Sequence, residues 1–289
     1  MNKTFFHLPP ELCDPETAKF HVVPVPYEAS VCFMPGTANG PDAILDVSDQ
    51  IERIDEVLLN EYCNFGIATH PPVPPGDSPE EEMRRIYQTM KSLFQPGKFP
   101  IALGGEHSIT PPIVRAAAEI YPDLSVLQFD AHSDLRDKYT TGGRFSHASA
   151  MRRVIEITPH LVQVGIRSFS AEELYECPTY IKNLITVPML ETESGLKSAI
   201  ETILSHLTDN VYITFDIDAF DPAFAPATGT PEPGGMTWRQ ATTVLHEVSK
   251  AKNVIGADVV EVAPYQNGNI VTEYLAARLV AKIIAFNAK

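Results

Sequence analysis

Short apolar segments alternate with segments of helical periodicity along most of the chain. The apolar runs predict strands at 21–26, 99–105, 124–132, 161–167, 185–188, 211–218 and 253–262. The helical spacing of apolar positions predicts helices at 79–94, 111–120, 146–157, 196–207, 237–249 and 270–286. Apolar strands that alternate with helices are typical of βαβ units, whose parallel sheet is covered on both faces. The pattern therefore predicts one domain over residues 1–289, an α/β fold with three α/β/α layers and a central, mostly parallel sheet.

Four of the predicted strands end in polar side chains. Alternate residues of an extended segment point to the same side, so the two acids and the imidazole of DAHSD (130–134) should converge. In parallel α/β sheets, ligands bind outside the carboxyl ends of the strands, so we expect all four groups to face one crevice. The groups are Glu106 with His107, Asp130 with His132 and Asp134, Asp216 with Asp218, and Glu261.

The four aspartates of this set would carry four negative charges if all were ionised. Crowded carboxylates protonate unless a positive charge lies between them. Two divalent cations would remove this conflict, with His107 and His132 as further ligands. Oxygen ligands with some imidazole and no thiolate suit Mn²⁺ and similar octahedral ions better than structural zinc. A single DxD segment is often a turn or a helix cap, so the metal site is inferred from the groups occurring together.

Composition narrows the range of partners. The formal charge is −15, and no basic stripe is present to neutralise phosphates, so nucleic acid is not expected as a partner. The acidity is compatible with a small cationic substrate. The sequence contains no apolar run long enough for a transmembrane helix and no signal peptide, so a cytoplasmic protein without membrane contact is expected. The four scattered cysteines include no CxxC pair, which fits a reducing compartment.

The polar segments resemble the signature motifs of the ureohydrolases, also called the arginase/agmatinase superfamily. The matching blocks are GGEHS (104–108), DAHSD (130–134), FDIDAFDPAFAPATGTPEPGG (215–235) and DVVEVAP (258–264), and the glycine–proline pattern from Gly36 to Ile44 fits the family's N-terminal region. The blocks occur in the family's order over nearly the whole chain. The resemblance implies an α/β/α fold, hydrolysis of a guanidino group to urea and an amine, and a homo-oligomer, commonly a trimer or hexamer.

The resemblance also implies two Mn²⁺ ions per subunit. The family's motifs assign His107, Asp130, Asp134 and Asp216 to one ion, and Asp130, His132, Asp216 and Asp218 to the other. Asp130 and Asp216 would therefore bridge the two ions. The need to balance the charge of the four aspartates leads to the same six side chains. Two such ions would lower the pKa of a water molecule that they share, which would supply the nucleophile for the guanidinium carbon.

Two catalytic residues follow from the same resemblance. His147, in RFSHASAMRR, matches the family's mobile histidine, and a histidine titrates in the range needed to protonate a leaving amine. Glu261 matches the acid that accepts two parallel N–H bonds from the guanidinium. The alternatives at these positions are a surface or capping histidine and a solvated acid. Glu106 and Asp221 are expected to orient ligand histidines or to shape turns, and Arg167 is assigned no catalytic role.

Agmatine is the expected substrate, and putrescine and polyamine synthesis is the implied pathway. Arginases carry an asparagine- and serine-rich loop before the catalytic histidine, whereas the loop 135–147 has no asparagine and continues into the SH-x-x-x-x-R form of short prokaryotic agmatinases. The basic residues Arg136, Lys138 and Arg144 leave an acid-tailed substrate such as guanidinobutyrate open. Guanidinobutyrase, arginase and aminopropylagmatine ureohydrolase are therefore the enzymatic alternatives within the family. An inactive, metal-stabilised binding protein and a two-metal amide or phosphoester hydrolase are the alternatives outside it.

Overall fold

The computed structural model describes residues 3–265 and 269–289. Within these residues, seven strands form one sheet in the order β2-β1-β3-β7-β6-β4-β5, and every pair of neighbouring strands is parallel. The strands are β1 (Phe20–Val25), β2 (Ile67–Thr69), β3 (Phe99–Gly104), β4 (Ser125–Phe129), β5 (Leu161–Val164), β6 (Asn210–Asp216) and β7 (Asn253–Val260). The predicted α/β class with a parallel sheet is confirmed.

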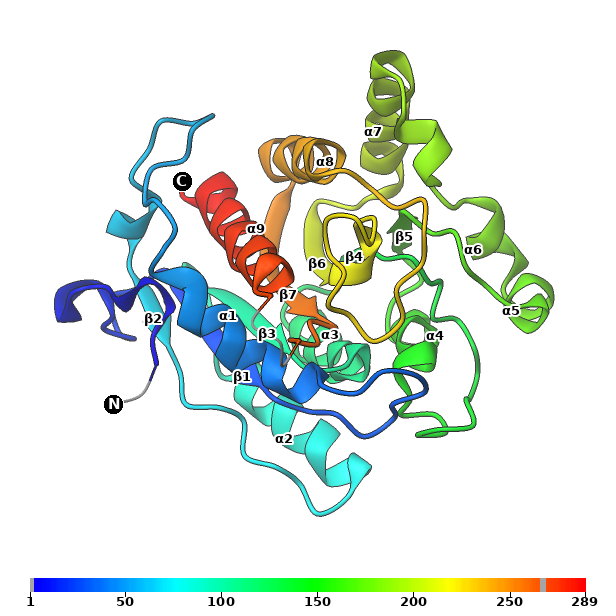
Figure 1. Cartoon of the computed structure of the whole chain (residues 1–289), viewed down its shortest axis with the longest axis horizontal. Coiled ribbons are helices and arrows are strands. Elements are labelled where there is room, and N and C mark those ends of the chain that lie inside the picture. Colours follow the sequence, from blue (N-terminus) through cyan, green and yellow to red (C-terminus); the bar gives the residue numbers. More distant parts are fainter. Residues whose placement is uncertain (1–2, 266–268) are drawn as a thin grey trace.

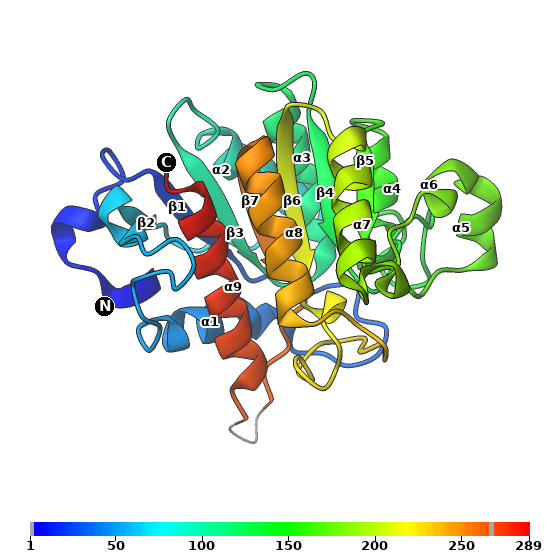
Figure 2. The ribbon, with the colours of Figure 1, turned by 90° about the horizontal axis from the view of Figure 1, so that it is seen from above.

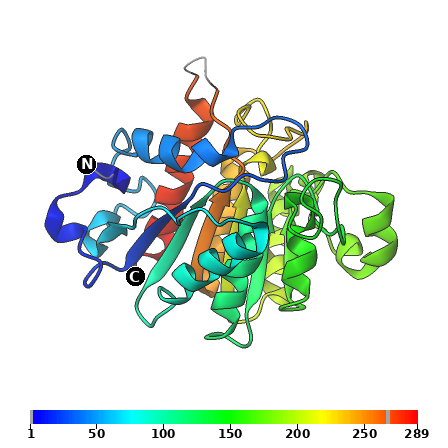
Figure 3. The same ribbon diagram turned by 90° about the horizontal axis from the view of Figure 1, so that it is seen from below.

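Helices cover both faces of the sheet (Figures 2 and 3). One layer contains α1 (Gly40–Ser48), α7 (Glu193–His206), α8 (Trp238–Ala251) and α9 (Val271–Asn287). The other contains α2 (Pro79–Lys91), α3 (Thr110–Ala118) and α4 (Ala150–Ile155). The short helices α5 (Ala171–Glu176) and α6 (Pro178–Lys182) lie beyond β5 at one edge of the molecule (Figure 1). In the described part of the chain, no helix is both long and apolar enough to cross a membrane.

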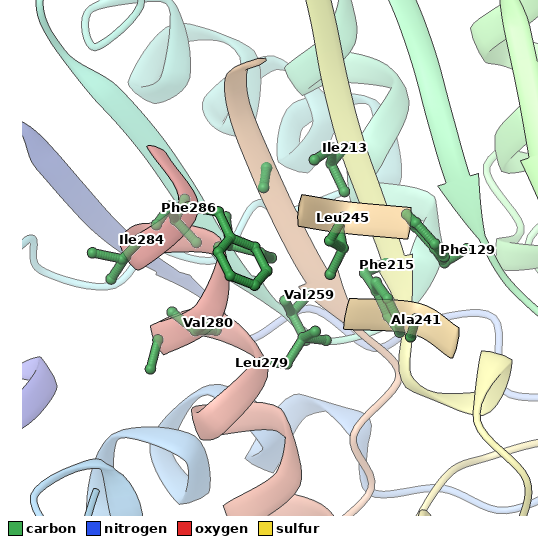
Figure 4. Packing of buried hydrophobic residues seen from close by; sticks show 14 of the residues in the cluster. Phe129, Ile213, Phe215, Ala241, Leu245, Val259, Leu279, Val280, Ile284 and Phe286 are labelled. Atoms are coloured by element: carbon green, nitrogen blue, oxygen red, sulfur yellow. The ribbon is translucent and has the colours of Figure 1, made fainter. Parts of the chain in front are cut away.

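The strands are apolar on both faces because each face is packed against a helical layer. Phe129 and Phe215 of neighbouring strands stack with ring centroids 4.7 Å apart and contribute to the core beneath α8 and α9 (Figure 4). Val126 and Tyr212, from the same two strands, belong instead to the core beneath α2 and α3. Burial on both sides holds the sheet rigidly, so the residues that follow the strands are fixed in position.

The starts of α2 and α8 carry side-chain caps that the sequence signals. Ser78 accepts a hydrogen bond from the Glu81 backbone N–H and caps α2, whose first turn begins with Pro79. Thr237 and Gln240 form a capping box at the start of α8. These local signals lie in the sequence itself, and both helices begin within one residue of the predicted position.

Some predicted elements are absent and some observed ones were not predicted. The strand expected at 185–188 is wrong: Ile185 makes only an isolated bridge to Val164, and a 3-10 helix begins at Val187. Pro188 lies in the first turn of that helix and cannot donate a ladder hydrogen bond. Strand β2 and helices α1, α5 and α6 were not predicted, and the predicted strands 124–132 and 161–167 end three residues early.

Candidate active site

Strand ends bring the predicted metal ligands together. The loops that follow β1 and β6 lie at the same edge of the molecule (Figure 2), and the side chains that follow β3, β4 and β6 converge there. His107 begins a short 3-10 helix after β3, and Asp216 is the last residue of β6. The expectation of one crevice at the carboxyl ends of the strands is met by this geometry.

The first cluster surrounds the His107 imidazole. Its Nδ1 atom lies 3.1 Å from Asp130 Oδ2, 3.1 Å from Asp134 Oδ2 and 3.5 Å from Asp216 Oδ2. All four side chains are buried. His107, Asp130 and Asp216 each offer one donor atom, and these three atoms lie within 4.8 Å of one another. This arrangement could hold a metal ion.

The second cluster shares one residue with the first. His132 Nδ1 lies 3.0 Å from Asp218 Oδ2 and 3.6 Å from Asp130 Oδ1. Asp130, His132 and Asp218 again offer donor atoms within 4.8 Å of one another. Asp130 therefore presents one carboxylate oxygen to each cluster, which is the arrangement expected of a bridging ligand. Asp216 faces His107 of the first cluster, and its predicted bridging role remains a prediction.

A buried nitrogen tests whether these residues fit a metal. His107 Nδ1 is buried without a hydrogen-bond partner, although three carboxylate oxygens lie around it. Its other ring nitrogen, Nε2, lies 2.8 Å from Thr214 Oγ1, which in turn donates to Asp258 Oδ1. Buried polar atoms normally have a partner, and a ligand histidine is normally held through its second nitrogen. The residues therefore fit a cation at Nδ1.

The pKa directions in this metal-free cluster show the same conflict of charge. Burial, together with the charges of Asp218 and Asp130, raises the pKa of Asp216 well above its usual value. Burial and the Asp130 charge raise the pKa of Asp134 to about 7. Burial alone would lower the pKa of His132, but Asp218 and Asp130 raise it to about 12. The raised pKa values mean that protons on the carboxyl groups and imidazoles balance the negative charge. Divalent cations would take the place of these protons.

Two acids of the site adopt left-handed backbone conformations. Asp134 has φ 53° and Glu261 has φ 64°. Non-glycine residues in this region are uncommon and cluster where the surrounding structure imposes a function. In both cases the turn directs a carboxylate toward the strand ends, because Asp134 lies against His107 and Glu261 Oε1 accepts the His107 backbone N–H at 2.6 Å.

A cavity of about 200 Å³ opens above the clusters. The cluster residues His132, Asp134 and Asp216 are among its lining residues. Burial, reinforced by the charge of Glu106, raises the pKa of Glu261 well above its usual value, so this carboxyl group is short of positive partners. The remaining lining residues are Cys32, Ser133, Arg136, Tyr139, His147, Ala148, Ser168, Phe169, Glu173, Thr230 and Glu261.

His147 lies on the wall of this cavity, outside both clusters. Its Nδ1 atom is 2.9 Å from Ser30 Oγ and its Nε2 atom is 3.3 Å from Cys32 Sγ. Burial lowers its pKa. An imidazole in this position can exchange protons with a molecule in the cavity without being a metal ligand.

The remaining sequence expectations concern residues outside the two clusters. Asp221 accepts from the backbone N–H groups of Ala223, Gly234 and Gly235, so it shapes a turn as expected. Arg167 donates to backbone carbonyls, including those of Asp218 and Glu232, and its role is structural.

Glu106 shapes a turn, as expected, because its carboxylate accepts from the backbone N–H groups of Ala29 and Ser30. It also accepts from the hydroxyl groups of Ser30 and Ser108, and Ser30 in turn contacts His147.

Several residues around the site were not predicted from the sequence. Gln128 Nε2 donates to Asp130 Oδ2, and Asp258 accepts from Thr110, Tyr212 and Thr214. Asp258 is an acid inside the otherwise apolar strand β7, and a buried acid needs hydrogen-bond partners. This feature of the sequence could have identified it as a residue that supports the site. Ser30 and Cys32 carried no such signal, because their contact with His147 joins positions more than a hundred residues apart.

The fold and the two clusters define an α/β protein with groups that could bind metal at the ends of parallel strands. The chain belongs to the Arginase family, which matches residues 18–285. It is 39% identical over 266 residues to the N(1)-aminopropylagmatine ureohydrolase of Thermus thermophilus, covering 92% of this chain and 89% of the relative. It is 35% identical over 265 residues to the agmatinase of Bacillus subtilis, covering 90% and 89%.

A solved structure shares the fold over nearly the whole chain. The agmatine ureohydrolase of Thermoplasma volcanium superposes with a TM-score of 0.87 at 30% identity, covering 99% of this chain and 94% of that one. The chain is therefore a ureohydrolase of the arginase family, a hydrolase of C–N bonds in linear amidines. The family depends on two metal ions, and the His/Asp clusters supply groups that could bind them.

Proposed function

We propose that the protein is an agmatinase, which hydrolyses agmatine to putrescine and urea. The observation that carries this proposal is the pair of His/Asp clusters joined by Asp130 beneath a cavity walled by His147 and Glu261. An inactive binding protein would have no need of this complete set. The similarity to enzymes named agmatinase supports the choice of substrate.

We propose the same metal ligands that the family's motifs assign. His107, Asp130, Asp134 and Asp216 would hold one ion, and Asp130, His132, Asp216 and Asp218 the other. Mn²⁺ is the proposed metal because the ligands are carboxylates and imidazoles without thiolates. When bound, the two ions supply positive charge and lower the pKa of a water molecule that they share.

The protein's own residues would place and protonate the substrate. The Glu261 carboxylate faces the cavity and can accept N–H bonds from the planar guanidinium, which holds the reacting carbon over the clusters. His147 lies on the cavity wall, where its imidazole can deliver a proton to the leaving amine. The proposed products follow, because protonation of that nitrogen releases putrescine and leaves urea.

The aromatic residues that line the cavity would favour a substrate with an amine tail. Tyr139 and Phe169 line the cavity, and aromatic faces suit an alkyl chain that ends in an ammonium group. This favours agmatine, and it also allows the longer amine tail of aminopropylagmatine, whose ureohydrolases are among the similar enzymes.

Arg136 supports a second candidate, guanidinobutyrase. Its guanidinium lies 5.1 Å from the centre of the Tyr139 ring and lines the cavity, where it could meet a carboxylate tail. Arg144 belongs to the same loop but is paired with Asp137 and Glu156. Only Arg136 of these two is therefore placed to select the tail.

The two candidates differ in a direct comparison of substrates. With Mn²⁺-loaded protein, kcat/KM for urea release is measured on agmatine, aminopropylagmatine, arginine, 4-guanidinobutyrate and 3-guanidinopropionate. We expect the highest value on agmatine and no loss of it in Arg136→Gln. Arg144→Gln is the matched control. A preference for 4-guanidinobutyrate that disappears in Arg136→Gln but persists in Arg144→Gln would replace agmatine by the acid-tailed substrate.

A further inference from the structure

His147 is held on its inner side by Ser30, a residue outside every family motif quoted above. Ser30 Oγ lies 2.9 Å from His147 Nδ1 and accepts the His147 backbone N–H at 3.0 Å. The Ser30 side chain therefore contacts the backbone and the ring of the same histidine. Ser30 is 1% exposed, so water does not compete freely for these contacts.

The Ser30 hydroxyl is itself oriented by a buried acid. Glu106 is 2% exposed and accepts from the backbone N–H groups of Ala29 and Ser30 at 2.8 and 2.7 Å. Its Oε1 atom accepts from Ser30 Oγ at 2.9 Å and from Ser108 Oγ at 2.5 Å. An ionised carboxylate accepts hydrogen bonds and donates none. The Ser30 hydroxyl therefore donates its single proton in the hydrogen bond to Glu106.

The hydrogen bond from Ser30 to Glu106 determines which ring nitrogen of His147 carries the proton. A hydroxyl oxygen that has donated its proton can only accept from its other neighbours, so the short contact with Nδ1 requires an N–H at Nδ1. A neutral imidazole carries one proton, which leaves Nε2 as the acceptor nitrogen.

The contact on the other side of the ring agrees with this assignment. Cys32 Sγ lies 3.3 Å from Nε2, and a thiol is a weak donor. Burial and the charge of Glu261 raise the pKa of the Cys32 thiol, which favours its protonated form. The contacts of both ring nitrogens therefore fit the tautomer of His147 that carries its proton on Nδ1.

We propose that Ser30, oriented by Glu106, is a positioning residue that fixes neutral His147 with its proton on Nδ1, so that Nε2 exchanges protons in the cavity. This inference rests on the catalytic role of His147 in the proposed function. Without Ser30, the ring loses its fixed orientation, and the Nε2–H tautomer, which cannot accept a proton at Nε2, becomes available.

A double-mutant cycle tests whether Ser30 acts through His147. With Mn²⁺-loaded protein and agmatine, kcat, KM and bound metal are measured for Ser30→Ala, His147→Ala and the double variant. We expect Ser30→Ala to lower kcat about 10-fold or more, within the range of general acid–base effects, with KM and bound metal unchanged. In the His147→Ala background, the same substitution should have no further effect on kcat. An equal loss in both backgrounds would show a structural role and overturn the proposal.

Ser108→Ala is the matched control. It removes a hydroxyl donor from the same Glu106 oxygen at a similarly buried position, 3% exposed, and Ser108 Oγ donates to Glu106 rather than contacting His147. We expect a much smaller loss of kcat than in Ser30→Ala. Equal losses in the two variants would assign the effect to the Glu106 carboxylate or the local fold and would contradict a role for the Ser30–His147 bond.

Crystal structures of the Mn²⁺-loaded wild type and Ser30→Ala separate this inference from the proposed function. They require no turnover, so they remain decisive even if no guanidino compound releases urea, an outcome that would defeat the proposed function alone. We expect the His147 ring to change orientation in the variant while both clusters keep their geometry. A ring that keeps its wild-type orientation would overturn the positioning role.

Discussion

Asp130 is the residue on which both candidate metal positions depend. It lies directly after β4, one carboxylate oxygen faces each cluster, and Gln128 and the His132 backbone N–H hold it in place. Replacing it with a neutral amide removes charge from both positions at once.

Asp130→Asn should therefore lose both bound ions. Urea release should fall more than about 100-fold, which exceeds the usual effect of an outer-shell change. Metal content by mass spectrometry and urea release are measured together. Asp123→Asn, at an exposed acid that accepts from Asn210, is the control. Two ions retained with full activity in Asp130→Asn would refute the bridging assignment.

His147 should affect turnover without affecting metal content. It lines the cavity but belongs to neither cluster, so its loss removes a proton donor and leaves every proposed ligand in place. His147→Ala should lower kcat by about 10²- to 10⁴-fold. Kinetics and metal analysis on the same preparation check this, and a loss of bound metal in the variant would count against the separation of roles.

At the scale of elements, α9 is tied to the loop after α1 by a buried ion pair. Lys282 Nζ lies 2.7 Å from Asp55 Oδ2, and the two side chains are 2% and 1% exposed. Arg278, one turn earlier on α9, pairs with Glu56 at the surface. Lys282 Nζ also lies 2.6 Å from Glu56 Oε1, so the two cations of the helix share this exposed acid, and only Lys282 reaches the buried Asp55.

Lys282→Ala should destabilise the protein by about 3–5 kcal/mol, because it leaves the Asp55 carboxylate buried without its partner. Arg278→Ala, the control, should cost about 0–1 kcal/mol, as exposed pairs do. Chemical denaturation of both variants measures the difference. An equal loss of unfolding free energy in both variants would show that burial does not determine the contribution of the Lys282–Asp55 ion pair to stability.

The sequence predicted those elements whose signals are local. Alternate acids after apolar runs located the six cluster residues, because strand direction and side-chain alternation together determine which side chains meet. The three-residue strand β2 is too short for a periodic signal, and the Gly-Pro pair at the start of α1 reads as a turn although proline fits the first helical turn. The contact of Ser30 with His147 depends on how distant loops fold together, which no local pattern contains.

At the scale of the whole molecule, the buried acids make stability depend on pH and metal together. In the metal-free protein, the pKa of Asp134 is raised from 3.8 to about 7. A carboxyl group with a higher pKa when folded binds more protons in the folded state between these values, so stability falls as pH rises through this window. The raised pKa of His132 acts in the same direction above its ordinary value of 6.5.

Mn²⁺ should therefore raise the Tm more at about pH 7.5 than at about pH 5, because it replaces the protons that these groups bind. Differential scanning fluorimetry with and without Mn²⁺ after chelation measures the two shifts. Asp134→Asn should reduce the pH dependence of the metal-free protein. A Tm increase of equal size at both pH values would argue against metal binding at these carboxylates.

The net charge of −15 bears on substrate encounter at the same scale. An acidic protein attracts a dication such as agmatine, and salt screens this attraction. The charge of the proposed substrate is thus consistent with the composition as well as with the site.

We propose above that this chain releases urea from agmatine by means of the two strand-end clusters. The most direct measurement supplies Mn²⁺ to the purified protein and quantifies urea and putrescine formed from agmatine. We predict equal amounts of the two products, and no reaction after chelation or in Asp130→Asn. Absence of urea from agmatine and from every other guanidino compound tested, with metal bound, would contradict the account.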